Sequence, residues 1–131
     1  MADLTPQAET IAKKRYYLKD ETGEPIENST DMFKRVAKTV ASVEQMYDKS
    51  ESEVQKTTDQ FFEMMDDLKF VPNSPTMMNA GTHQGTLSAC FVLPLEDTME
   101  GIMKGATDAA MVQKFGGGTG FSLSKLRPRG A

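Results

Sequence analysis

Apolar residues recur at helical spacing over two consecutive stretches in the first half of the chain. The first covers about 31–47 and follows several candidate N-cap residues at 28–31. The second begins near Ser50 or Ser52, each of which has a Glu or Gln three residues further on, as in a capping box. The apolar positions are Met32, Phe33, Val36, Val40 and Val43 in the first stretch and Val54, Phe61, Phe62, Met65 and Leu68 in the second. This pattern predicts two helices that pack as a hairpin.

The segments on either side of this hairpin have mixed patterns. Residues 1–28 combine a short helical stretch at 11–18 with a turn at 19–25, and we interpret them as an adapter. After the hairpin, Pro72 and Pro75 each restrict the preceding residue to extended geometry. We therefore expect the helical part to end near residue 69, with Ser74 in a turn.

The remainder of the chain predicts a strand, a helix and a second strand. The apolar run at 90–93 has the length of a buried strand, and Glu96-Asp97-Thr98 offers caps for a helix that ends at the glycines 116–118. A second strand is expected over 121–126. Such a unit normally joins parallel strands by a right-handed crossover. Two parallel strands do not make a stable sheet, so further elements are expected to cover them.

Composition narrows the class of protein. The 131 residues fit one compact domain, and a net charge of −4 with a pI near 5.0 lacks the basic surface that nucleic-acid binding needs. No apolar run approaches the ~20 residues that would cross a bilayer, so no membrane is expected. The amino terminus does not resemble a signal peptide, and the expected location is the cytoplasm.

Several residues carry possible chemistry, and each also has a structural interpretation. Cys90, the single cysteine, is either a small buried apolar residue or a reactive thiol whose partner comes from elsewhere. The glycines at 116–120 either end a helix or bring backbone close to a ligand, although their order fits neither a Walker A loop nor a dinucleotide fingerprint. Asp97 is a helix cap or a ligand contact. His83 lacks neighbours at metal-ligand spacing, so no metal site is predicted.

Three strings then occur together in order: FVPNSPTMMNAGT at 70–82, LSACFVLPLEDTMEGI at 87–102 and KFGGGTGFSLSKLRPRG at 114–130. They resemble the opening of the catalytic barrel of ribonucleotide reductases, in the form typical of the adenosylcobalamin-dependent class II enzymes. KRYYLKDETGEPIENSTDMFKRVA at 14–37 is similar to the helical segment before that barrel.

The resemblance implies an α/β fold in two parts. Residues 1–69 would be an N-terminal helical region. Residues 70–131 would supply the first strand–helix–strand unit of a ten-stranded α/β barrel, which is incomplete in this chain. The implied function is conversion of ribonucleotides to 2′-deoxyribonucleotides by thiyl-radical chemistry, for deoxyribonucleotide biosynthesis and DNA replication. Because most catalytic segments lie later in the family, the chain is expected to be inactive without the remaining C-terminal polypeptide.

The resemblance also assigns the site residues. Cys90 matches the catalytic cysteine that supplies reducing equivalents and becomes half of a disulfide, renewed by a thioredoxin-type reductant. The substrate-binding positions are Ser74, Ser88, Ala89, Gly117 and Gly118. The positions that match the dNTP or ATP effector site are Asp97, Lys114 and Arg127.

Two further implications concern assembly and cofactor. The helix at 98–114 resembles the family's homodimer interface, which would place the effector between subunits. Adenosylcobalamin would be bound mainly by segments outside this chain. The alternative hypothesis is a non-catalytic helical interaction module in which Cys90 is a packing residue and the glycines end a helix.

Overall fold

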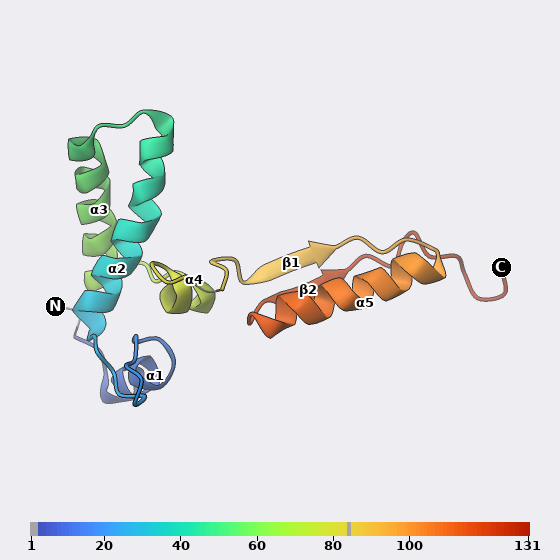
Figure 1. The fold of residues 1–131 in the computed structure, drawn as a ribbon, viewed down its shortest axis with the longest axis horizontal. Coiled ribbons are helices and arrows are strands. Elements are labelled where there is room, and N and C mark those ends of the chain that lie inside the picture. Colours follow the sequence, from blue (N-terminus) through green and yellow to red (C-terminus); the bar gives the residue numbers. More distant parts are fainter. Residues whose placement is uncertain (1–2, 84) are drawn as a thin grey trace. The chain divides into compact units, whose positions relative to one another are not determined.

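The computed structural model describes residues 3–83 and 85–131, and the chain divides into two compact units, Met1–Leu87 and Ser88–Ala131. Figure 1 shows the helices and strands of both units. The first is helical and the second contains the strands, as the sequence predicts. The division follows Leu87, whereas the sequence places the boundary after residue 69, because Met77 and Ala80 pack into the same core as the helices. Within the described residues, no helix is long and apolar enough to span a membrane.

The chain enters the first unit through a short capped helix and a tight turn. Helix α1, Pro6–Arg15, has Thr5 as its N-cap, whose hydroxyl accepts a hydrogen bond from the Ala8 N–H at 3.2 Å. The predicted turn follows, closed by an isolated antiparallel bridge between Lys19 and Pro25. The Asp20 carboxylate accepts backbone N–H bonds inside this turn and holds it closed.

The predicted helical hairpin is confirmed by α2, Ser29–Ala41, and α3, Glu51–Asp66 (Figure 1). Both begin with a capping box, formed by Asn28 with Asp31 and by Ser50 with Glu53. The first helix was expected to continue to about residue 47. Instead it tightens after Ala41 into the 3₁₀ helix η1, Ser42–Tyr47, whose residues are not buried.

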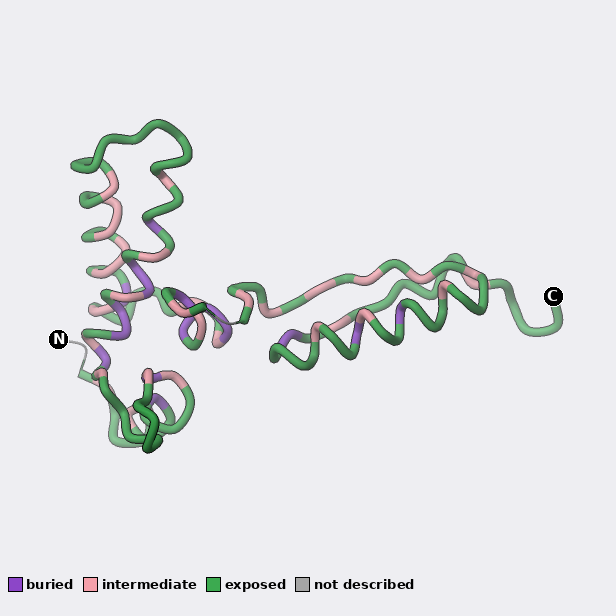
Figure 2. Tube along the Cα trace, viewed as in Figure 1, coloured by how far each residue is buried: buried purple, intermediate pink, exposed green. Residues whose placement is uncertain are grey.

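The core of the first unit lies where α2 faces α1, α3 and the segment after α3 (Figure 2). Met32, Phe33 and Val36 on α2 are at most 2% exposed. Burial of each such side chain contributes about 1.5–3 kcal/mol, so α2 supplies the largest part of the packing. The other buried members are Ala12, Tyr17, Ala37, Met65, Met77 and Ala80.

A short helix that the sequence analysis did not predict, α4, Ser74–Asn79, follows the hairpin. We expected a turn here because of the two prolines. Asn73 caps the helix by accepting from the Thr76 N–H at 2.9 Å, and Pro75 lies in the first turn, where a missing backbone N–H costs no helical hydrogen bond. Pro75, Thr76 and Met77 are buried, so packing stabilises a helix too short to persist alone.

A buried ion pair joins α4 to the hairpin. The Arg35 guanidinium on α2 donates to both carboxylate oxygens of Glu27, at 2.6 and 3.0 Å, and these side chains are 11% and 7% exposed. The same group donates to the carbonyls of Ala80, at 2.6 Å, and Met77, at 3.1 Å. Glu27 also accepts from the Leu18 N–H at 2.8 Å. One cation thus connects α2, the end of α4 and the adapter.

The second unit is the predicted strand–helix–strand. Strand β1, Cys90–Leu93, pairs in parallel with β2, Gly118–Phe121, and α5, Met99–Lys114, lies between them in sequence. The register aligns Cys90 with Gly118 and Leu93 with Phe121. Thr98 caps α5 through the Gly101 N–H.

Two details of this unit differ from expectation. Strand β2 was expected over 121–126, yet it begins at Gly118, because the Gly118 N–H already donates to the Ala89 carbonyl at 2.7 Å and starts the ladder. Strand β1 was expected to be buried, but Cys90 is exposed and Val92 is 84% exposed. A parallel strand pair covered by one helix has too few neighbours to bury both faces.

Candidate functional site

The thiol of Cys90 is exposed at the first residue of β1. Ser88 and Ala89 lead directly into the strand, and the Ala89 carbonyl is already engaged by the Gly118 N–H. The structure therefore brings four of the sequence-predicted positions together around the beginning of the ladder: Ser88, Ala89, Cys90 and Gly118.

The glycines after α5 have different structural roles. Gly116 has a φ of +83°, a left-handed conformation that favours glycine, and its N–H bonds to the Gln113 carbonyl, so it ends the helix. Gly117 is buried, and a Cβ on it would lie 2.6 Å from Val112 Cγ1 and 2.9 Å from Phe91 Cε2. At Gly118 the same atom would meet only the Ala89 carbonyl, at an ordinary 3.5 Å.

Gly117→Ala is expected to destabilise the second unit by about 1–3 kcal/mol, the range for overpacking a filled site. The added methyl would collide with Val112 and Phe91, which join α5 to β1. Urea unfolding monitored by circular dichroism measures the loss. Gly120→Ala is the matched control, because a Cβ there meets nothing within 4 Å. Equal stabilities for the two variants would contradict this packing role.

Asp97 and Arg127, two of the predicted effector contacts, bind each other. The Arg127 Nε donates to Asp97 Oδ2 at 2.8 Å, and the guanidinium also donates to the Asp97 carbonyl at 3.1 Å. The side chains are 61% exposed for Arg127 and 33% for Asp97, so the pair lies at the surface. Arg127 retains further N–H groups, because a guanidinium carries five. The pair thus offers an anion a cation whose orientation is already fixed.

Lys114, the third predicted effector contact, does not join this pair within one chain. It is the last residue of α5, whose 16 residues span about 24 Å, whereas Asp97 precedes the first turn. Its ammonium lies 5.7 Å from the centre of the Phe115 ring. One small ligand on a single chain therefore cannot contact Lys114 and Asp97 through the same group.

Ser74 belongs to the first unit, at the first residue of α4, whereas Cys90 belongs to the second. The Ser74 hydroxyl oxygen lies 3.0 Å from the Tyr16 hydroxyl oxygen, and both side chains are half-buried. Tyr16 is not among the site residues that the sequence indicates. No local signal could have found it, because the two residues are 58 positions apart and the contact depends on how α1 and α4 pack.

His83 is exposed. Among residues 3–83 and 85–131, no three His, Cys, Asp or Glu side chains gather where they could hold a metal ion.

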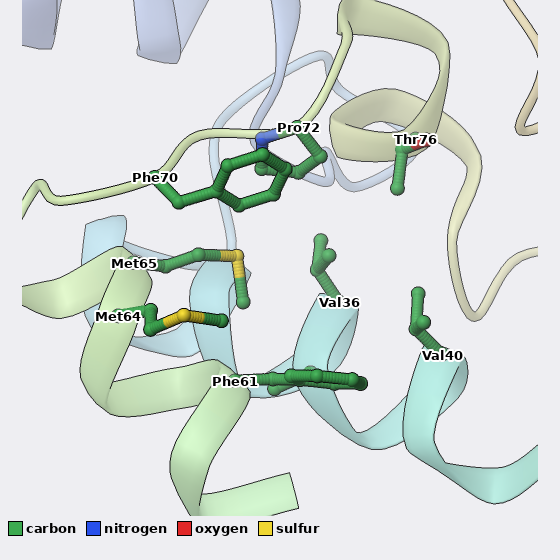
Figure 3. A pocket seen from close by; sticks show the side chains of 9 residues that line it. Val36, Val40, Phe61, Met64, Met65, Phe70, Pro72 and Thr76 are labelled. Atoms are coloured by element: carbon green, nitrogen blue, oxygen red, sulfur yellow. The ribbon is translucent and has the colours of Figure 1, made fainter. Parts of the chain in front are cut away.

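The first unit also contains an open apolar pocket of about 270 Å³. Side chains of α2 and α3 line it together with the segment before α4 (Figure 3). None of the residues assigned to the redox, substrate or effector sites is among those described as lining it. The lining residues are Val36, Ala37, Val40, Phe61, Met64, Met65, Phe70, Pro72 and Thr76.

Comparison with protein families matches both units. Residues 2–85 match the all-alpha domain of ribonucleotide reductase, and residues 88–131 match its barrel domain. These two spans meet where the chain divides into its compact units. The chain belongs to the ribonucleotide reductase large-chain family.

Curated relatives agree with this assignment. A vitamin B12-dependent ribonucleoside-diphosphate reductase of Mycobacterium tuberculosis is 42% identical over 97% of this chain, and a protein of the same name from Thermoplasma acidophilum is 36% identical over 96%. The chain spans only 18% and 23% of those proteins. A ribonucleoside-diphosphate reductase subunit alpha of Helicobacter pylori is 33% identical over 89% of the chain and 14% of its own length.

A solved structure shows the same fold. The class Id ribonucleotide reductase alpha subunit of Actinobacillus ureae superposes with a TM-score of 0.73 over 98% of this chain and 22% of that one, at 23% identity. The helical region followed by the start of a barrel, expected from the sequence, is therefore confirmed as the fold. No comparison favours the alternative of a non-catalytic helical module.

Proposed function

We propose that this chain supplies the N-terminal part of a cobalamin-dependent ribonucleotide reductase and acts only together with the remaining C-terminal polypeptide. The observation that carries the proposal is the position of Cys90 as the first residue of β1, in the segment that matches the barrel domain. A strand held in register by its neighbour fixes that thiol at the end of a rigid element.

The chemistry explains why a thiol is needed at this position. Replacing the 2′-hydroxyl of a ribonucleotide by hydrogen consumes two electrons and two protons, and the oxygen leaves as water. Two thiols supply both by closing a disulfide. Cys90 is the one cysteine of this chain, so its partner sulfur comes from the rest of the reductase. A thioredoxin-type reductant would then reopen the disulfide for the next turnover.

Substrate contacts are proposed at both units. Ser88, Ala89 and Gly118 adjoin Cys90 at the start of the ladder, and the Ser74 hydroxyl would contact the ribonucleotide from α4. Gly117 stays in the proposed set through its backbone, although its lack of a side chain is already explained by Val112 and Phe91. The substrate would be a ribonucleoside diphosphate or triphosphate, and the names of the relatives, which are ribonucleoside-diphosphate reductases, favour the diphosphate.

We propose that adenosylcobalamin binds to segments of the assembled reductase that this chain does not contain. The proposal rests on the names of the relatives, which are vitamin B12-dependent reductases much longer than this chain. The cofactor would generate the radical that starts the reaction. The residues of this chain would instead hold substrate and deliver reducing equivalents through Cys90.

The test is to reconstitute the activity of the assembled reductase, which we expect to be a cytoplasmic enzyme. The chain, produced together with the remaining barrel of the reductase, is expected to convert ribonucleotides to 2′-deoxyribonucleotides when adenosylcobalamin and a dithiol are supplied. Product is measured by chromatography. No product should form when this chain, the cofactor or the dithiol is left out. Turnover that persists without this chain would reject the proposal.

Effector binding is proposed at the Asp97–Arg127 pair, with Arg127 pairing with the phosphates of a dNTP or ATP and Asp97 accepting hydrogen bonds from its sugar. If two copies associate through α5 in a homodimer, Lys114 of a second copy could complete a site that lies too far away within one chain. This arrangement would connect the effector to the neighbouring active site.

Asp97→Ala or Arg127→Ala is expected to blunt effector control of base choice more than it slows basal turnover. A hydrogen bond to a charged group contributes about 1.5–3 kcal/mol, so half-maximal response should need roughly ten- to a hundredfold more effector. Lys125→Met, which removes an exposed positive charge two residues away, is the control. The ratio of products from paired bases is measured against effector concentration. An unaltered response in both variants would contradict the assignment.

A further inference from the structure

The Tyr16 hydroxyl is the hydrogen-bonding partner of Ser74, at 3.0 Å between oxygens. We propose that Tyr16 is a positioning residue, which holds the Ser74 hydroxyl in the orientation in which it contacts the ribonucleotide. The inference rests on the substrate role proposed above for Ser74. It assigns a function to a residue in the adapter, outside the barrel segment and away from Cys90 in sequence.

Tyr16 is itself held in place from three directions. Its backbone N–H caps α1 by bonding to the Ala12 carbonyl at 2.8 Å. Its carbonyl accepts from the Arg35 guanidinium at 3.4 Å. Its ring packs against the buried core of the first unit. The phenol therefore presents its hydroxyl to Ser74 from a fixed position rather than from a mobile side chain.

Ser74 is held by the same cation. Arg35 donates to the Met77 and Ala80 carbonyls at the end of α4, and the Asn73 cap fixes the beginning of that helix. One buried guanidinium thus connects the backbone of Tyr16 to the helix that begins at Ser74. The distance between the two hydroxyls is set by this shared support, which explains how residues 58 positions apart stay within hydrogen-bonding reach.

A hydroxyl group needs such a partner to point its hydrogen in one direction. Serine has one O–H to donate and two lone pairs to accept, and the hydrogen rotates freely when nothing holds it. When the Tyr16 O–H donates to Ser74, the Ser74 O–H is left to donate to an acceptor on the substrate. Prior orientation of a contact group improves substrate binding because the complex then orders one fewer rotor.

Tyr17 offers a matched control one residue away. Its hydroxyl donates to the Glu9 carboxylate at 2.8 Å, and its side chain is buried in the same core. Burial, followed by the Glu9 carboxylate, raises the pKa of Tyr17 to about 12. Removing this hydroxyl also removes a hydrogen bond from a tyrosine of the adapter, but the lost bond does not involve Ser74.

The experiment compares Tyr16→Phe, Ser74→Ala, the double variant and Tyr17→Phe in the assembled reductase. The variants at Tyr16 and Ser74 are each expected to raise KM for the ribonucleotide by about three- to tenfold, the effect of losing one hydrogen bond. The kcat should stay within about twofold, since the bond orients substrate rather than reacts. The double variant should match Ser74→Ala alone, and Tyr17→Phe should keep the wild-type KM.

Any other outcome contradicts the inference, and the set of variants shows which assumption is wrong. If Tyr16→Phe keeps the wild-type KM while Ser74→Ala raises it, Ser74 binds substrate without help from Tyr16. If Tyr16→Phe raises KM equally in the Ser74→Ala background, it acts through another group. If Ser74→Ala keeps the wild-type KM, the substrate role itself is wrong. Absence of turnover in the wild-type assembly would reject the proposed function as a whole.

A structural effect is distinguished by stability. Thermal unfolding of Tyr16→Phe and Tyr17→Phe is measured in parallel, because each removes one hydroxyl from the same packed region. The proposal expects the two phenylalanine variants to differ in KM even where their melting temperatures fall by similar amounts. If KM rises in both variants in proportion to the fall in melting temperature, the effect is one of stability, and the positioning role of Tyr16 is contradicted.

Discussion

Cys90→Ser is expected to abolish nucleotide reduction in the assembled reductase while leaving substrate binding almost unchanged. Serine fills nearly the same volume at the start of β1, but its oxygen cannot form a disulfide or deliver the electron pair. Turnover with a dithiol measures the first effect, and equilibrium binding of the ribonucleotide measures the second. The exposed thiol also predicts that an alkylating reagent inactivates the enzyme and that bound substrate slows the inactivation.

The binding measurement is the control for folding. Loss of turnover together with loss of binding would indicate that the serine disturbs the ladder rather than the redox step. Retained turnover in Cys90→Ser would reject the proposed role directly, because no other cysteine of this chain could replace it. The same result would favour the alternative interpretation of Cys90 as a small packing residue.

Arg35→Leu is expected to destabilise the chain by about 3–5 kcal/mol, the largest stability loss that we predict. The substitution leaves the Glu27 carboxylate buried without its cation and removes the donors to the Met77 and Ala80 carbonyls. Typical domains are stable by about 5–15 kcal/mol, so this loss leaves much of the chain unfolded at moderate urea. Urea titration monitored by circular dichroism provides the free energy of unfolding.

Two further variants test whether the loss of stability in Arg35→Leu comes from breaking the buried ion pair. Glu27→Leu combined with Arg35→Leu should recover part of the lost stability, because no unpaired charge then remains buried. Lys104→Met removes an exposed cation paired with Asp108 on α5, and should leave the unfolding midpoint almost unchanged. If Arg35→Leu were as mild as Lys104→Met, the buried pair would not be the connection between α2 and α4 that the structure indicates.

The elements that the sequence predicted well are those whose ends are marked by local chemistry. Asn28 with Asp31, and Ser50 with Glu53, form capping boxes that fix where two helices begin. Helix α4 was missed because proline is a sign of helix termination in most positions and is tolerated only in the first turn. Its existence depends on burial of Met77 and on the distant Arg35, which no local pattern reveals.

The candidate site shows the same division between local and distant information. Cys90, Asp97 and Arg127 were found because their surrounding strings resemble a family, and the structure adds that Asp97 and Arg127 bind each other. The first residue of β2 was missed because glycines usually weaken strands, whereas here Gly117 makes room for Phe91 and Gly118 begins the ladder. Tyr16 could be found only from the packed structure.

The parallel ladder affects how this chain should be expressed and purified. Within the described residues each strand pairs with one neighbour, so the outer backbone edge of each strand is open, and Val92 adds an exposed apolar side chain. Unpaired strand edges of this kind can pair with strands of other molecules and so promote aggregation. Co-expression with the rest of the barrel would provide the next strands as the ladder forms. It should therefore give less aggregated protein than mixing the two pieces after separate purification.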